Sequence, residues 1–173
     1  HHNEIQNRVR AEVADLGQRR LTPADLPQLR YTVAVLHEAL RLCPPAPVVT
    51  RTATVDIDVA GYRVEAGTEL VVGISAMHRD PALWDNPLIF DPDRFSPQNS
   101  AGRDRWQYLP FGGGPRSCIG DHFAMLEATL ALATIICDVE ILSSDDEFPV
   151  TTPFTAVAAG PVLAVTRKVR HDG

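Results

Sequence analysis

One cysteine near the end of a glycine-rich loop has the surroundings of a metal-binding thiolate. The loop runs Phe111-Gly112-Gly113-Gly114-Pro115-Arg116-Ser117-Cys118-Ile119-Gly120 and leads directly into an apolar segment. A thiol at the start of a helix lies near the positive end of the helix dipole, which favours its thiolate form. Because a thiolate is a soft metal ligand, Cys118 is a candidate ligand for an iron.

The neighbours of this cysteine suit a bound flat group. Three consecutive glycines, 112–114, can adopt positive φ and allow such a group to approach the backbone. Arg116 offers a guanidinium fork for carboxylates, and Phe111 offers an apolar shield for the sulfur. Two other interpretations of Cys118 remain open: a small core residue, or a hydrolase nucleophile with His122 as its base. The nucleophile would also need an oxyanion hole and an orienting residue, which the sequence does not reveal.

A second group of residues pairs charges beside an apolar helix stripe. Glu38 and Arg41 are three residues apart, so both lie on the same helix face and can pair. Exposed pairs of this kind contribute only about 0–1 kcal/mol. This pair, however, precedes the helix-ending Pro44-Pro45. Arg94 lies in the later segment Pro92-Asp93-Arg94-Phe95, and from there it can reach Glu38 and pin that segment to the helix.

Hydrophobic periodicity predicts mainly helical structure with small β-sheets, an α+β class. Four helical segments are expected. The first covers 5–16, the second begins at Thr22 with its following proline, the third runs from 26 to the prolines at 44 and 45, and the fourth covers 119–137. On the first helix, Arg8 is expected to pair with Glu4 and Glu12. Four short β-branched runs predict one small antiparallel sheet: 48–54, 56–59, 62–64 and 69–73. Three late strands are expected at 150–152, 155–158 and 161–166, with a turn at Gly160-Pro161 joining the last two. The irregular segment up to Tyr108 is expected to pack around its aromatic residues.

Composition excludes several function classes. The 173 residues carry a formal charge of −6 and no basic stripe, which argues against nucleic-acid binding. Three cysteines without a C-x-x-C pair favour a reducing compartment, and we expect a cytoplasmic protein. The most apolar run, 123–137, is too short to span a bilayer. The chain begins at His1 without an initiator methionine, so we expect that it was processed or is a piece of a longer protein.

The motifs together resemble those of the cytochrome P-450 family. Phe111-x-x-Gly114-x-Arg116-x-Cys118-x-Gly120 is similar to that family's haem-binding signature. Glu38-x-x-Arg41 and Pro92-x-Arg94-Phe95 match its other two motifs in the same order. The resemblance covers the whole chain and implies the C-terminal, haem-proximal part of the cytochrome P-450 fold. Residues 1–173 then form one partial domain: three N-terminal helical segments, a small sheet, a meander loop, the cysteine loop, a long buried helix and a C-terminal hairpin.

The resemblance also implies roles for single residues. Cys118 would be the axial ligand of haem b, and therefore the metal ligand. Arg116 and Arg51 would bind the haem propionates. Other cofactor-binding residues of the loop would be Phe111, Gly112, Gly114 and Gly120. Glu38, Arg41 and Arg94 would form a structural triad. The substrate pocket would be lined by Val48, Val49, Phe154 and Thr155.

The activity implied is that of a haem-thiolate monooxygenase. It would insert one oxygen atom from O2 into a small apolar substrate, terpene-like or fatty-acid-like, as in soluble bacterial members of the family. Electrons would come from NAD(P)H indirectly, through a ferredoxin-type partner. The family's oxygen-activating acid–threonine pair is absent from the sequence, so no catalytic residue is assigned and the segment alone is expected to be inactive. The alternative is a truncated, non-catalytic remnant with weak or no haem binding.

Overall fold

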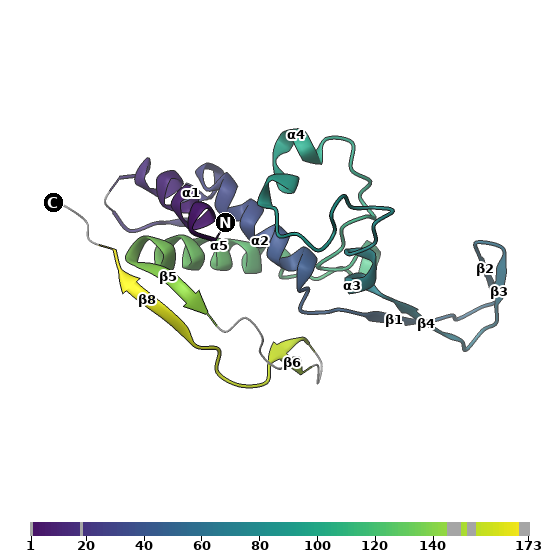
Figure 1. Cartoon of the computed structure of the whole chain (residues 1–173). Coiled ribbons are helices and arrows are strands. Elements are labelled where there is room, and N and C mark those ends of the chain that lie inside the picture. The colour runs from purple at the N-terminus through teal and green to yellow at the C-terminus, as the bar shows by residue number, and fades with distance from the viewer. Residues whose placement is uncertain (1, 18, 145–149, 152–154, 170–173) are drawn as a thin grey trace.

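Three helices form the body of the molecule (Figure 1). The computed structural model describes residues 2–17, 19–144, 150–151 and 155–169. The helices are α1 (His2–Ala14), α2 (Arg30–Leu42) and α5 (Asp121–Asp138), with a 3-10 turn, η1 (Pro23–Gln28), before α2. The four helical segments expected from the sequence are therefore confirmed. Their shared core contains Val13, Leu29 and Ala133, with Leu16, Leu21, Leu130 and Cys137 packed around it.

The polar side chains of α1 make contacts over long sequence distances, and the expected pairs of Arg8 with Glu4 and Glu12 are not formed. Arg8 instead makes a bidentate pair with Asp93, at 2.7 and 2.8 Å. Glu12 accepts the backbone N–H of Tyr31 at 2.6 Å and of Thr32 at 2.9 Å. These N–H groups belong to the first turn of α2, where no intrahelical acceptor exists, so Glu12 caps α2 from a neighbouring helix.

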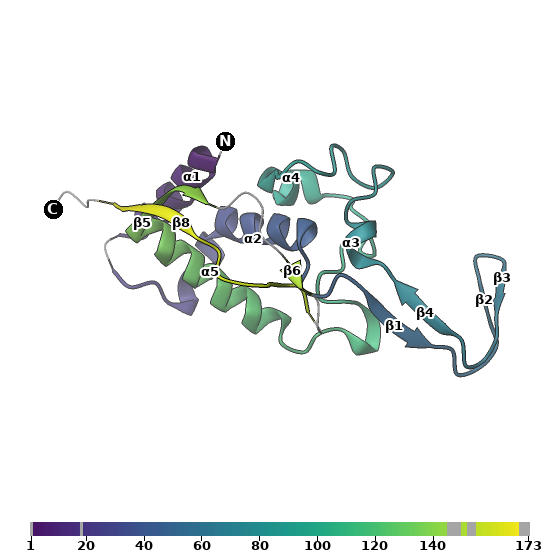
Figure 2. The same cartoon turned by 60° about the horizontal axis from the view of Figure 1, so that its bottom comes forward.

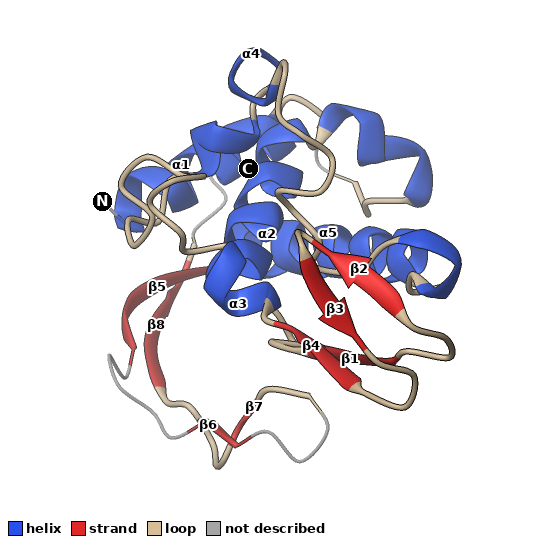
Figure 3. Ribbon diagram, turned by 90° about the vertical axis from the view of Figure 1, so that its right-hand side faces the viewer, coloured by secondary structure: helices blue, strands red, loops and turns tan. Residues whose placement is uncertain are grey.

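The strands after α2 form a narrow arm that extends from the helices in Figure 1 and faces the viewer in Figure 3. The expected four strands are present, but the expected single sheet is wrong. β1 (Val49–Thr52) pairs antiparallel with β4 (Glu69–Val72), and β2 (Ile57–Val59) pairs with β3 (Tyr62–Val64). The inner hairpin closes tightly because Ala60 and Gly61 both have positive φ, at 53° and 83°. The two strand pairs, β1 with β4 and β2 with β3, are separate two-stranded sheets.

The C-terminal strands are nested, which differs from the expected order. β5 (Val139–Ser144) follows α5 directly and pairs with β8 (Ala164–Lys168). β6 (Val150–Thr151) pairs with β7 (Val157–Ala158), so the strands on either side of Gly160-Pro161 do not pair with each other. Figure 2 shows β5 and β8 running along the helical body. Gln6 of α1 exchanges two hydrogen bonds with the Ile141 backbone, at 2.8 and 2.9 Å, and so covers the β5 edge.

The segment between the arm and the cysteine loop is irregular but packed. It starts after α3 (Ile74–Met77) and contains η2 (Pro92–Phe95) and α4 (Pro97–Ser100). Trp84 is 4% exposed, and its ring lies against those of Phe95 and Tyr108, with centroids 6.1 and 6.3 Å apart. The expected aromatic packing is confirmed for Trp84 and Phe95, whereas Trp106 is 50% exposed. In the described residues, no helix is both long and apolar enough to cross a membrane.

Candidate functional site

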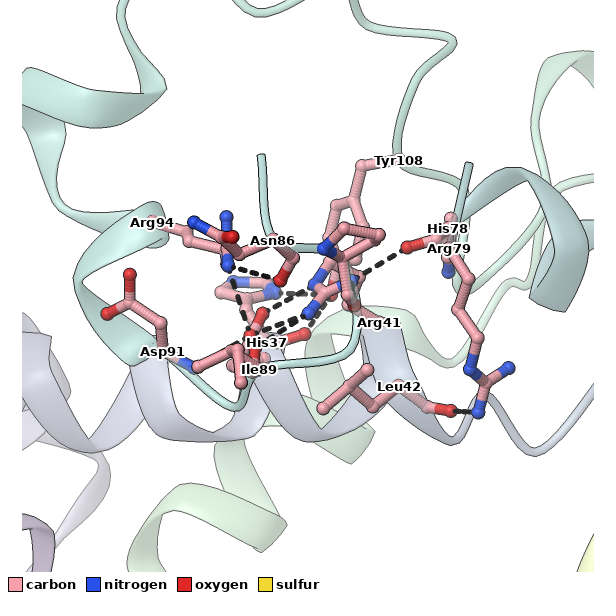
Figure 4. A network of polar contacts seen from close by, with 12 residues as sticks. His37, Arg41, Leu42, His78, Arg79, Asn86, Ile89, Asp91, Arg94 and Tyr108 are labelled. Carbon is pink, nitrogen blue, oxygen red and sulfur yellow. Dashed lines mark hydrogen bonds and ion pairs between the residues drawn. The ribbon is translucent and has the colours of Figure 1, made fainter. Parts of the chain in front are cut away.

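A buried ion pair on α2 is the centre of the polar network in Figure 4. Arg41 Nε donates to Glu38 Oε2 at 2.7 Å, Arg41 Nη2 donates to Glu38 Oε1 at 2.8 Å, and neither side chain is exposed. The remaining guanidinium hydrogens donate to backbone carbonyls of three residues: His78 at 2.8 Å, Pro87 at 2.7 Å and Ile89 at 3.2 Å. All five donors of the Arg41 side chain are therefore used.

The same carboxylate fixes the segment that carries Arg94. Glu38 Oε1 accepts the backbone N–H of Asp91 at 2.8 Å and lies 3.4 Å from Arg94 Nε. Arg94 Nη2 also donates to the Asn86 carbonyl at 2.9 Å. The three residues Glu38, Arg41 and Arg94 thus lie together. Through them the irregular segment is held against α2, and Figure 4 shows Arg41 with Asp91 and Arg94 of that segment.

Two histidines, the buried His78 and the half-buried His37, hold the residues immediately before the cysteine loop. His78 is fully buried, and its Nε2 accepts the Leu109 N–H at 2.9 Å. Tyr108 donates its hydroxyl hydrogen to the His37 carbonyl at 3.0 Å and lies 3.0 Å from His37 Nδ1. Burial lowers the pKa of both imidazoles, that of His78 to about 4, and raises the pKa of the Tyr108 hydroxyl. These groups are therefore neutral at neutral pH.

The cysteine loop, residues 111–120, closes on itself through backbone hydrogen bonds. The Cys118 N–H donates to the Phe111 carbonyl at 2.9 Å, and the Gly112 N–H donates to the Leu109 carbonyl at 3.0 Å. Gly112 and Gly114 both have φ of +73°, a conformation that L side chains rarely adopt. Glycine at these two positions is thus required by the course of the loop.

The cysteine and the apolar residues after it face outward from the described part of the chain. Cys118 is exposed, Ile119 is fully exposed, and 70% of the Phe123 surface is exposed. A helix that is apolar on nearly all sides is normally covered, so this start of α5 has the character of a contact surface. A flat apolar group is one kind of partner for such a surface.

The donor set fits a metal that brings most of its own ligands. Within the described residues, no group of three or more His, Cys, Asp or Glu side chains could hold a bare ion. A haem iron already has four ring nitrogens and needs one protein thiolate. At Gly120, φ is an ordinary −101° and an added Cβ would meet no atom within 4 Å. The described residues therefore do not explain a glycine at 120, whereas a flat group lying against the loop would explain it.

A model of the family described as cytochrome P450 matches residues 1–163. The chain belongs to the cytochrome P450 family. Human cytochrome P450 4V2 is 44% identical over 136 residues, which are 77% of this chain and 26% of that protein. Cyclooctatin synthase of Streptomyces melanosporofaciens is 49% identical over 128 residues, 73% of this chain and 28% of that protein. The chain therefore spans about a quarter of the length of these relatives.

Solved structures of cytochrome P450 proteins agree with the fold. The haem domain of cytochrome P450DA superposes with a TM-score of 0.89 at 32% identity, covering 98% of this chain and 38% of that one. Retinoic acid-bound cyanobacterial CYP120A1 superposes with a TM-score of 0.87 at 31% identity, covering 97% and 39%. The expected α+β, cytochrome P450-type fold is confirmed.

The remaining predicted residues of this cytochrome P450 chain lie in three segments: at β1, in the cysteine loop and before β7. Arg51 on β1 and Arg116 are exposed, and neither forms an ion pair within the described residues. Val48 is exposed, and Val49 and Thr155 are half-buried. Phe154 lies outside the described residues. The roles of all these residues stay predictions.

Sequence reasoning missed His37 and Tyr108. For His78 it favoured a structural role over a place near the haem, but it did not identify the partner Leu109. A single histidine or tyrosine carries no local spacing signal, because its partners lie 31 to 71 positions away. The only available signal was the similarity of the segment His78-Arg79-Asp80-Pro81 to the family.

Proposed function

We propose that the complete gene product is a haem-thiolate monooxygenase and that Cys118 is its single protein ligand to iron. One observation carries this proposal: an exposed thiol at the start of α5, in a loop closed by the Cys118–Phe111 hydrogen bond and followed by exposed apolar side chains. Membership of the cytochrome P450 family supports the same chemistry.

The chain's own residues would bind and shield the group. Cys118 donates the thiolate, and the backbone amides of the loop orient that sulfur. Arg116 and Arg51 would offer guanidinium groups to the two propionates. Arg51 Nη1 also donates to the Thr50 carbonyl at 2.7 Å, which leaves its other N–H groups for a propionate. Phe111 limits the access of water to the sulfur. When bound, haem with a thiolate ligand supplies O2 activation, because thiolate donation favours O–O cleavage.

The substrate we propose is a small apolar molecule, terpene-like or fatty-acid-like. Two of the predicted pocket segments are close in space, since the Ala156 N–H donates to the Pro45 carbonyl at 2.6 Å. This contact joins the region of Thr155 to the region of Val48 and Val49. The cyanobacterial relative with bound retinoic acid, an apolar isoprenoid acid, supports the choice. Electrons would reach the iron from NAD(P)H through a ferredoxin-type protein near 116–122, in the cytoplasm.

The hydrolase alternative has less support. His122 Nδ1 lies 2.6 Å from Asp121 Oδ1, and the His122 side chain is 99% exposed. In the described part of the chain, Cys118 forms no hydrogen bond with His122. A base that lies in solvent without a hydrogen bond to the thiol does not activate it.

The test is the spectrum of the reduced, carbon monoxide-bound complete protein. We expect the red-shifted Soret band of thiolate ligation in the wild type and its loss in Cys118→Ala. Cys43→Ala is the matched control, because Cys43 is also exposed but lies after α2. A Cys118→Ala protein that keeps the band would overturn the ligand assignment. A wild type that binds no haem would instead favour the non-catalytic remnant.

A further inference from the structure

We propose that His78 is a positioning residue that ties the cysteine loop to the buried Glu38–Arg41 pair and thereby keeps Cys118 coordinated as a thiolate. The inference rests on the proposed function, since it concerns how well the loop presents its sulfur to a haem iron. It assigns a role to a buried side chain outside the three sequence motifs.

The backbone of His78 is fixed at both of its polar groups. Its carbonyl accepts Arg41 Nη1 at 2.8 Å, and its N–H donates to the Ile74 carbonyl at 2.9 Å as the cap of α3. Arg41 is held in turn by Glu38, with no exposed surface on either residue. The backbone of His78 is therefore tied to Arg41, as Figure 4 shows, while its ring Nδ1 is buried without a hydrogen-bond partner among the described residues.

The ring of His78 in turn fixes the chain immediately before the cysteine loop. Nε2 accepts the Leu109 N–H at 2.9 Å, so the ring hydrogen is on Nδ1. The rings of Tyr108 and Trp84 lie on its sides, with centroids 5.1 and 6.4 Å away. This packing leaves the imidazole little freedom to turn, and the neutral form is favoured by burial.

From Leu109 the connection continues through the loop itself. The Leu109 carbonyl accepts the Gly112 N–H at 3.0 Å, and the Phe111 carbonyl between them in sequence accepts the Cys118 N–H at 2.9 Å. A shift of Leu109 therefore moves both backbone contacts that close the loop. Arg41 donates to the backbone carbonyl of His78 and not to its ring, so all five Arg41 hydrogen bonds remain available when the ring is replaced. The ion pair and the ring contact can therefore be tested separately.

The experiment compares His78→Phe with His78→Gln in the haem-loaded complete gene product. Phenylalanine keeps a ring but leaves the Leu109 N–H buried without an acceptor, whereas the glutamine amide oxygen reaches about as far as Nε2. The measured quantity is the rate at which the reduced, carbon monoxide-bound thiolate form converts to the blue-shifted, neutral-thiol form. We expect about a tenfold faster conversion in His78→Phe and a rate within about twofold of wild type in His78→Gln.

Val9→Ala is the control for general destabilisation, because Val9 is buried in α1 and far in sequence from the loop. It should lower the free energy of unfolding without changing the conversion rate. If His78→Phe does not fold, His78→Asn replaces it with the same expectation, since the shorter amide does not reach the Leu109 N–H.

The outcomes separate this inference from the proposed function. A wild type with the thiolate band and a His78→Phe rate equal to wild type overturns the inference alone. So does a His78→Gln rate as fast as that of His78→Phe, or a Val9→Ala rate that matches it. A wild type without the band overturns the proposed function, and the inference with it.

Discussion

Arg41 Nε lies 2.7 Å from Glu38 Oε2, and both side chains are completely buried. Burying two charges costs desolvation energy that their mutual attraction offsets only when the geometry is good and the other polar atoms are satisfied. Here Arg41 uses all its donors, and Glu38 also accepts the Asp91 N–H at 2.8 Å. The pair therefore acts as a fixed point to which three chain segments are attached, more than as a source of net stability.

Removing one partner of this pair should be costly. Arg41→Ala leaves the Glu38 carboxylate buried without its main partner and frees three backbone carbonyls. We expect the free energy of unfolding to fall by about 3–5 kcal/mol, measured by urea denaturation of the complete protein. Haem retention should fall with it, because the carbonyl of His78 loses its donor.

The control for this loss is an exposed pair on the arm. Arg63 and Asp56 lie 2.7 Å apart, with side chains 75% and 50% exposed. Arg63→Ala should change the free energy of unfolding by less than about 1 kcal/mol. An equal loss of unfolding free energy in Arg41→Ala and Arg63→Ala would contradict the conclusion that burial makes the Glu38–Arg41 pair costly to break.

Glu12 gives a second prediction, concerning the start of α2. Glu12→Ala removes the acceptor of the Tyr31 and Thr32 N–H groups, and Thr32 is fully buried. We expect a loss of about 1–2 kcal/mol in the free energy of unfolding, the usual range for a lost helix cap. Glu4→Ala, on the exposed side of the same helix, should be close to neutral in the same assay. A neutral Glu12→Ala would mean that water satisfies this helix end.

Local patterns predicted most elements because each has a clear period or a strong end signal. The prolines at 44 and 45 mark the end of α2, and Ala60-Gly61 marks the inner hairpin. β5 was missed because Val139 begins a strand on the residue after α5 ends, with no glycine or proline between them. Strand pairing in the nested C-terminal ladder depends on contacts between distant residues, and no local signal encodes it.

The candidate site shows the same division between local and distant information. The spacing of Glu38 and Arg41 predicted their pairing, and the motif order predicted Arg94 beside them. Apolar periodicity alone, however, would place Leu36 and Leu40 on the buried face of α2. These two are only half-buried, whereas Glu38 and Arg41 are fully buried. A hydrophobic pattern reflects only the preference of each side chain for water or the protein interior, so it does not reveal a buried charge whose polar atoms are all paired.

The His78 ring makes stability depend on pH. Its pKa is lowered from 6.5 to about 4, mainly by burial and further by the positive charges of Arg41 and Arg79. Between these pH values the unfolded ring binds a proton that the folded ring does not. The neutral His78 ring therefore makes its full contribution to the free energy of unfolding above about pH 6.5. This contribution, at most on the order of 3 kcal/mol, is lost as the pH drops toward 4.

Urea denaturation at several pH values tests this dependence. His78→Gln has no titrating ring at this position, so its curve of unfolding free energy between pH 6.5 and 4 should be flatter than that of wild type. The half-buried His37, whose pKa is also lowered, contributes a similar slope to both proteins. Val9→Ala should shift the wild-type curve downward without changing its slope. Parallel curves for wild type and His78→Gln would exclude a proton-linked role of this ring.

Gly120 tests whether a flat group lies against the cysteine loop. An added Cβ at 120 would meet no described atom within 4 Å, and the backbone conformation there suits any residue. Gly120→Ala should therefore change the free energy of unfolding of the haem-free protein by less than about 1 kcal/mol. Haem affinity should fall by about tenfold, because the methyl group would occupy the space of the ligand. Gly160→Ala, at another open glycine, should leave haem affinity unchanged. Equal haem titration curves for Gly120→Ala and wild type would place the haem away from Gly120.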